Sequence, residues 1–70
     1  MNAAEALARQ IRRVAILRGQ YAALRFQPGV NVAPALLMID AALEQGCKAA
    51  GSDDIVAQIA AAQALEGFEE

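Results

Sequence analysis

Two small groups of side chains in this 70-residue sequence are of types that take part in chemistry. Cys47 stands beside Lys48, and a nearby ammonium group favours the nucleophilic thiolate form of a cysteine. Cys47 also continues an apolar helical stripe, where a free cysteine behaves as a small hydrophobic residue. We therefore expect Cys47 to be largely buried and chemically quiet.

The second group, Ser52, Asp53 and Asp54, offers oxygen ligands for a divalent cation. Neighbouring helical residues point about 100° apart, and no further ligand lies nearby in the sequence. We expect these residues to start a helix, with Ser52 as its cap and the carboxylates at the positive end of the helix dipole. Since the chain also lacks histidine, the sequence predicts no catalytic residue, no cofactor and no metal site.

The arginines form a third group, which concerns binding and not catalysis. Arg9, Arg12 and Arg13 share one side of a predicted helix, and Ile16 lies among them. This side is either a solvated outer face or a docking face for a partner with an acidic surface. Contact with nucleic acid is the least favoured interpretation, because no aromatic or asparagine side chain accompanies the arginines there. Arg18 and Arg25 border the apolar stripe and should extend toward acidic residues of the later helices.

Charge is distributed unevenly along the chain. Residues 1–35 hold five arginines against one glutamate, a formal charge of +4, whereas residues 36–70 carry −6. The net charge of −2 and the acidic pI of about 4.9 argue against a dedicated nucleic-acid binder. Alanine and arginine richness with a single lysine is typical of GC-rich bacterial or phage coding sequences.

The clearest element is a helix over residues 3–25. Asn2 is its predicted cap, with Glu5 in a position to answer it. The Pro28-Gly29 turn follows the helix and stops it. Apolar residues recur at steps of three and four on one stripe, which consists of Leu7, Ile11, Val14, Leu17, Tyr21 and Leu24.

A second helix is predicted over residues 32–49, with Asn31 as its cap. Gly46 either ends this helix early or lies in its interior. We favour an interior position, because Cys47 continues the stripe and Glu44 to Lys48 is a favourable four-residue ion pair. The predicted stripe consists of Val32, Leu36, Ile39, Leu43, Cys47 and Ala50.

A third helix is predicted over residues 53–66, with Ile55, Ile59, Ala62 and Glu66 on its inner face. Short connections favour antiparallel neighbours. The sequence therefore predicts a single all-α domain over residues 1–70, more than about 65% helical. Its architecture is a small three-helix bundle, or a long helical hairpin with a third helix folded across it.

Association is expected because the core is thin. Alanine supplies nearly half of the apolar residues, and chains below about 70 to 80 residues gain little from burial alone. Leu37 and Met38 lie outside the main face of the second helix, where either the third helix covers one of them or both form an exposed patch. Exposed apolar residues of this kind favour a symmetric homodimer.

The sequence thus predicts a small non-enzymatic protein-protein interaction module or accessory subunit. The residues expected to bind its partners are Arg9, Arg12, Arg13, Ile16, Leu37 and Met38. Its expected partners are a second copy of itself, a protein with an acidic surface, or both. The alternative is a nucleic-acid-associated regulator that uses the first helix. We expect no secretory signal and no membrane span, and the unpaired cysteine fits the cytoplasm.

Overall fold

The computed structural model describes residues 2–68 and contains three helices, with no strand among those residues. Helix α1 spans Ala3–Leu24, α2 spans Ala33–Ala50 and α3 spans Ile55–Glu66. The structure is 78% helical, which confirms the all-α prediction. Each helix packs against the other two, so the architecture is a three-helix bundle.

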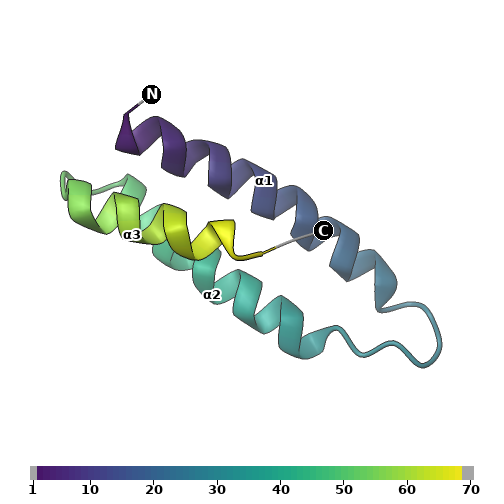
Figure 1. Ribbon diagram of the computed structural model, residues 1–70. Helices are drawn as coiled ribbons and strands as arrows, with labels where there is room; N and C mark the ends of the chain where they lie inside the picture. Colours follow the sequence, from purple (N-terminus) through teal and green to yellow (C-terminus); the bar gives the residue numbers. More distant parts are fainter. Residues whose placement is uncertain (1, 69–70) are drawn as a thin grey trace.

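The bundle is elongated, with extents of 44 × 18 × 16 Å. Helices α1 and α2 form an antiparallel hairpin, and α3 turns back along it in the same direction as α1 (Figure 1). The 12 residues of α3 compare with 22 in α1 and 18 in α2. Helix α3 therefore lies against the half of the hairpin that holds the start of α1 and the end of α2 (Figure 1). The other half, next to the 25–32 loop, has no third helix packed on it among residues 2–68, and we call it the open half of the hairpin (Figure 1).

Capping and turn residues fix both ends of α1. The side chain of Asn2 accepts from the Glu5 amide at 2.8 Å, as predicted. The Glu5 carboxylate answers the side-chain amide of Asn2, at 3.5 Å. After the helix, Gly29 adopts φ +82, a left-handed conformation that glycine tolerates without strain, and the chain reverses there.

The cap of α2 is Val32 and not Asn31 as predicted, and Val32 makes no side-chain capping hydrogen bond. Asn31 instead accepts from the Ala33 amide at 3.2 Å, and the helix continues through Gly46 to Ala50. The longer of the two predicted forms is therefore confirmed. Gly46 is buried because α1 and α3 both approach it closely. A β-carbon at residue 46 would lie 3.2 Å from Leu65 Cδ1 and 3.3 Å from Ile11 Cγ1, so glycine permits this three-helix contact.

The start of α3 differs from the prediction. Asp54, not Ser52, is the cap, and its carboxylate accepts from the Ala57 amide at 3.1 Å. Ser52 organises the preceding turn, donating to the Ala49 carbonyl at 2.8 Å and accepting from the Asp54 amide at 3.3 Å. The buried Gln58 side chain ties α3 to this turn by donating to the Ser52 carbonyl at 2.9 Å.

The core lies along the axis where the three helices meet. The α1 stripe is confirmed at its centre, since Leu7, Val14 and Leu17 are buried. The stripe predicted for α2 is wrong at its end: Cys47 is exposed, and Gly46 and Ala49 are buried instead. The buried hydrophobic residues are Leu7, Val14, Leu17, Val32, Ile39, Ala49, Ala62 and Leu65.

The predicted inner face of α3 is also largely wrong. Ile55 is 62% exposed and Ile59 is 45% exposed, and Glu66 lies on the surface, whereas Ala62 is buried as expected. Small residues let α3 approach the hairpin closely, so the helix turns Ala62 and Leu65 inward and its β-branched residues outward.

Candidate interaction surfaces

The outer face of α1 carries two of the three predicted arginines. Arg9 and Arg12 are exposed and line a shallow depression together with Glu5 and Ala8. Ile16 is 59% exposed, so it has no core role. Neither Arg9 nor Arg12 forms an ion pair with a described residue. This face is a positively charged surface with one large apolar side chain.

Arg13 does not belong to that face, contrary to the sequence prediction. Its guanidinium is partly buried against α3, where Nη1 donates to the Phe68 carbonyl and Nη2 to the Leu65 carbonyl, both at 2.8 Å. Its Nε donates to Gln10 Oε1 at 2.9 Å. The last carbonyls of a helix lack intrahelical partners, and a cation there also complements the helix dipole. Arg13 therefore holds the end of α3 against α1.

Arg18 also has an internal role, in agreement with its predicted direction. Its guanidinium binds the Asp40 carboxylate of α2 through Nε to Oδ1 and through Nη2 to Oδ2, the latter at 3.3 Å. The hydrogen bond from Arg18 lowers the pKa of Asp40, and the same bond raises the pKa of Arg18. Both side chains are about half exposed, so the pair fixes the position of α1 on α2 more than it stabilises the fold.

Two further polar contacts lie on the surface. The Arg25 guanidinium lies over the Phe26 ring, 5.2 Å from its centroid, so Arg25 does not reach an acidic helix as predicted. The predicted pair within α2 is present, with Lys48 Nζ 3.7 Å from Glu44 Oε1. Among the residues that the structure describes, the only other ion pair is that of Arg18 with Asp40.

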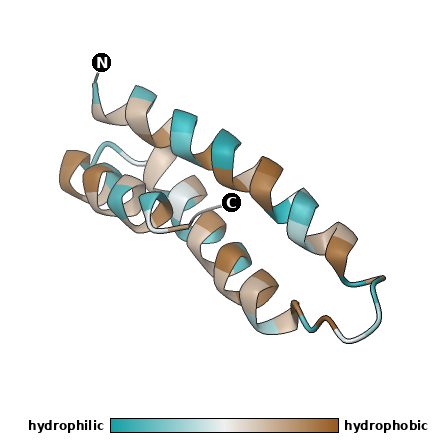
Figure 2. Cartoon of the chain, turned by 45° about the vertical axis from the view of Figure 1, so that its right-hand side comes forward, coloured by the Kyte–Doolittle hydropathy of each residue, from teal (hydrophilic) through white to brown (hydrophobic). Residues whose placement is uncertain are grey.

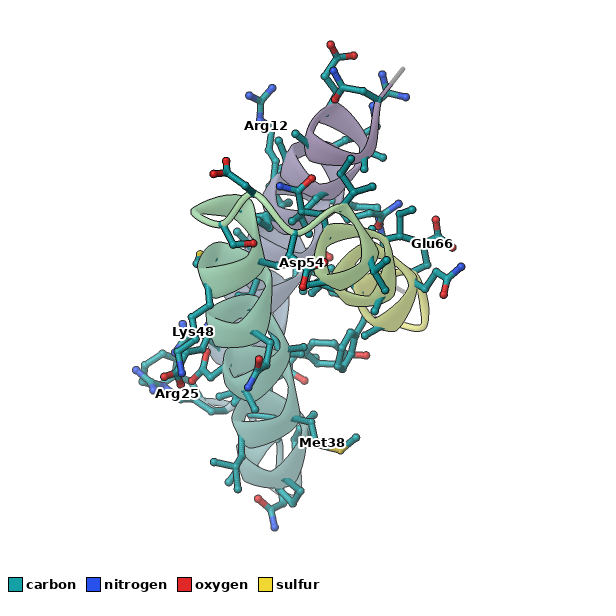
Figure 3. All side chains as sticks on the ribbon, turned by 90° about the vertical axis from the view of Figure 1, so that its left-hand side faces the viewer. Arg12, Arg25, Met38, Lys48, Asp54 and Glu66 are labelled. Atoms are coloured by element: carbon teal, nitrogen blue, oxygen red, sulfur yellow. The ribbon has the colours of Figure 1, made fainter. Side chains whose placement is uncertain are left out.

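Leu37 and Met38 are 73% and 63% exposed, so α3 covers neither of them. They do not form one patch, because adjacent helical residues point about 100° apart. Met38 points to the side of α2 on which α3 lies, beyond the end of α3, while Arg25 lies on the opposite side (Figure 3). Met38 is therefore part of the open half of the hairpin.

The outer side of α3 is a further apolar surface, which sequence reasoning missed. Ile55, Val56 and Ile59 are 62%, 75% and 45% exposed. No acidic or basic residue occurs in α3 before Glu66. The start of this helix has high hydropathy (Figure 2). The sequence feature that could have revealed this surface is the absence of charged residues from Ile55 to Leu65, since a helix at the surface normally has a charged or polar side.

Two of the residues considered as cation ligands have structural roles. Ser52 and Asp54 are engaged in the turn and the helix cap described above. In residues 2–68, no three histidine, cysteine or carboxylate side chains are placed to hold a metal ion. Within that same range, no helix is long and apolar enough to cross a membrane.

Comparison with protein-family models, with curated proteins and with solved structures finds no match to this chain. Function is therefore inferred from its exposed side chains, which fall into two apolar surfaces and one basic surface. Helix α3 supplies the first apolar surface, with Ile55, Val56 and Ile59, and the open half of the hairpin supplies the second. The outer face of α1 supplies the basic surface.

Proposed function

We propose that this protein is a small non-enzymatic interaction module, an adaptor or accessory subunit that works by binding protein. The observation that carries the proposal is the outer side of α3, which has three large aliphatic residues facing solvent and no charged residue before Glu66. Clustered apolar residues on a helical face are typical of protein contact surfaces. The single unpaired cysteine fits a reducing compartment such as the cytoplasm.

The alternative, a nucleic-acid-associated regulator, is weakened by the internal roles of Arg13 and Arg18. Arg9 and Arg12 remain on the outer face of α1, and two side chains supply few phosphate contacts. Together with Ile16, they fit the acidic surface of a partner protein better than a nucleic acid.

Affinity capture from the source cells tests the proposal, with wild-type protein and a Val56→Glu variant as baits. Val56 is 75% exposed, so the variant is expected to keep its fold. Partners that bind through α3 should be lost from the variant and retained by a Leu37→Glu control, since Leu37 lies on a different surface. The proposal fails if wild-type protein retains neither itself nor another protein.

An electrophoretic shift assay tests the alternative. Wild-type protein should not retard duplex DNA or RNA, even at low ionic strength, where phosphate contacts are strongest. A shift that weakens with salt and disappears when Arg9 and Arg12 are replaced by glutamine would favour the regulator.

A further inference from the structure

Helix α3 carries large apolar residues on both its inner and its outer side, and its outer side bears a charge only at Glu66, the last residue of the helix (Figure 3). Its inner side buries Ala62 and Leu65 against the hairpin, and its outer side exposes Ile55, Val56 and Ile59. A helix that is hydrophobic all round is normally buried all round. In the monomer, described residues cover only the inner side of α3. The outer side has no helix packed against it.

The hairpin has the opposite deficiency, because half of it lacks a third helix. Arg13 contacts the end of α3, and Leu24 follows eleven residues later. Eleven residues make about three helical turns, so Leu24 faces the same side of α1 as Arg13. Met38 precedes the buried Ala49 of α2 by the same interval, so the two residues face the same side of α2. The α3 side of the open half therefore presents Leu24 and Met38.

These open residues are apolar and partly exposed. Leu24 is 37% and Met38 is 63% exposed. Arg25 lies on the opposite side of the hairpin from α3 and does not place its charge on this surface (Figure 3). The open half is thus an uncharged apolar surface, which matches in character the part of the outer side of α3 that holds Ile55, Val56 and Ile59.

From this match we infer that the partner is a second copy of this chain, stacked antiparallel so that each α3 lies between two hairpins. The outer side of α3 in one copy covers the open half of the hairpin in the other, and a two-fold axis passes near the C-terminal ends of the two α3 helices. This inference rests on the proposed function and names the partner and the surfaces.

The lengths of the helices agree with this arrangement. At 1.5 Å per residue, α3 is about 18 Å long and α1 is about 33 Å long. Two α3 helices placed end to end therefore span about the length of one hairpin. The two-fold axis also repeats the contact, so both apolar surfaces of both copies are covered.

The exposed area agrees as well. The chain exposes 4797 Å², whereas a typical monomer of 7.3 kDa exposes about 4200 Å². The excess of about 600 Å² is close to what a small stable interface removes from each partner.

The arrangement specifies which residues meet. Val56 lies eleven residues before Gly67, at the end of α3, and Leu24 lies eleven residues after Arg13, which contacts that end. Rotation by 180° about the two-fold axis brings Val56 of one copy to the Leu24 end of α1 in the other. By contrast, Leu37 points away from the α3 side of α2 and takes no part in the contact.

A charge-pair experiment tests these positions. Val56→Glu places a carboxylate in the first turn of α3, and Leu24→Lys places an ammonium group in the last turn of α1. Both changes complement the helix dipoles and should preserve the fold. Light scattering at about 100 μM, well above a micromolar dissociation constant, reports the oligomeric state. Circular dichroism confirms that each variant retains its helices.

We expect wild-type protein to be a dimer, and each single variant to weaken dimerisation at least about tenfold by burying an unpaired charge. The Val56→Glu/Leu24→Lys double variant should recover dimerisation, because each new carboxylate then meets a new ammonium group across the interface. The matched control Leu37→Glu should remain dimeric.

Three outcomes overturn the inference. A wild-type monomer excludes the second copy, while capture of another protein through Val56 would still support the proposed function. The double variant could stay monomeric while a mixture of Val56→Glu chains and Val56→Lys chains forms dimers. That result would show that the α3 helices of the two copies contact each other and not the hairpins. Dissociation by Leu37→Glu places the interface on the other side of α2.

Discussion

Gly46 of α2 and Leu65 of α3 lie so close together that a β-carbon at residue 46 would be 3.2 Å from Leu65 Cδ1. Ile11 of α1 approaches the same position to 3.3 Å. One glycine thus marks the point where all three helices meet. A larger residue there would push α3 away from the hairpin.

A pair of glycine substitutions measures the value of this close approach. Gly19 of α1 has no atom within 4 Å of a β-carbon position, so Gly19→Ala should stabilise the protein by about 0.5–1 kcal/mol through helix propensity. Gly46→Ala gains the same propensity but crowds Leu65 and Ile11, so it should be at least about 1 kcal/mol less stable than Gly19→Ala. Urea denaturation compares the two variants. Equal stabilities would mean that the core yields freely at residue 46.

The three helices were predictable because their signals are local. Asn2 with Glu5, the Pro28-Gly29 turn and the spacing of Leu7 and Val14 fix α1 without reference to the rest of the chain. The faces of α2 and α3 depend on where the helices meet, and this information is not local. Near its start α2 meets only α1, whereas near Gly46 it meets α1 and α3, so its buried side rotates and leaves Cys47 outside.

Helix α3 was the hardest element to orient. Apolar residues occupy both of its sides, so its pattern gives no direction toward the core. Large residues such as Ile55 were expected inside, but the alanines permit closer packing and Leu65 fills the centre. The role of Arg13 was equally hidden, because the carbonyls that it binds are 52 and 55 residues away in the sequence.

Arg13 should be the most important arginine for stability. Its hydrogen bonds to the Leu65 carbonyl in the last turn of α3 and to the Phe68 carbonyl just after the helix are partly buried, and hydrogen bonds to charged groups contribute about 1.5–3 kcal/mol. Arg13→Met should therefore lower the free energy of unfolding by about 1–3 kcal/mol, and hydrogen exchange should increase first in α3. The matched control is Arg12→Met on the exposed face, with an expected change within about 0.5 kcal/mol. Similar losses in both variants would contradict the capping role.

Cys47 should react with thiol reagents in the native protein. Its exposed position reverses the expectation from the apolar stripe. A small aromatic disulfide reagent should modify native protein about as completely as denatured protein, with one thiol released per chain. Cys47→Ser removes the signal and serves as the control. Protection in the native state would show that Cys47 is covered, for example by association.

The pair of Arg18 and Asp40 predicts a specific response to acid. Because Arg18 lowers the pKa of Asp40 in the folded protein, the pair stabilises the fold above the ordinary aspartate pKa of about 4. This contribution is lost as the pH falls through the lowered value. The urea midpoint of wild-type protein should therefore exceed that of Asp40→Asn near neutral pH, and the difference should disappear at low pH. A difference that persists in acid would exclude an origin in this ion pair.

Asp54 should account for most of the local stability at the start of α3. Its carboxylate accepts from the Ala57 amide at 3.1 Å, and removal of such a cap costs about 1 kcal/mol. Asp54→Ala should therefore lower the free energy of unfolding by about that amount. Asp53→Ala removes an equal charge one residue earlier, where no cap hydrogen bond is made, and should change stability by less than about 0.5 kcal/mol. Urea denaturation of the two variants separates the cap from the general effect of negative charge near the helix dipole. Equal losses would assign the stabilisation to charge, and a larger loss for Asp53→Ala would contradict the cap.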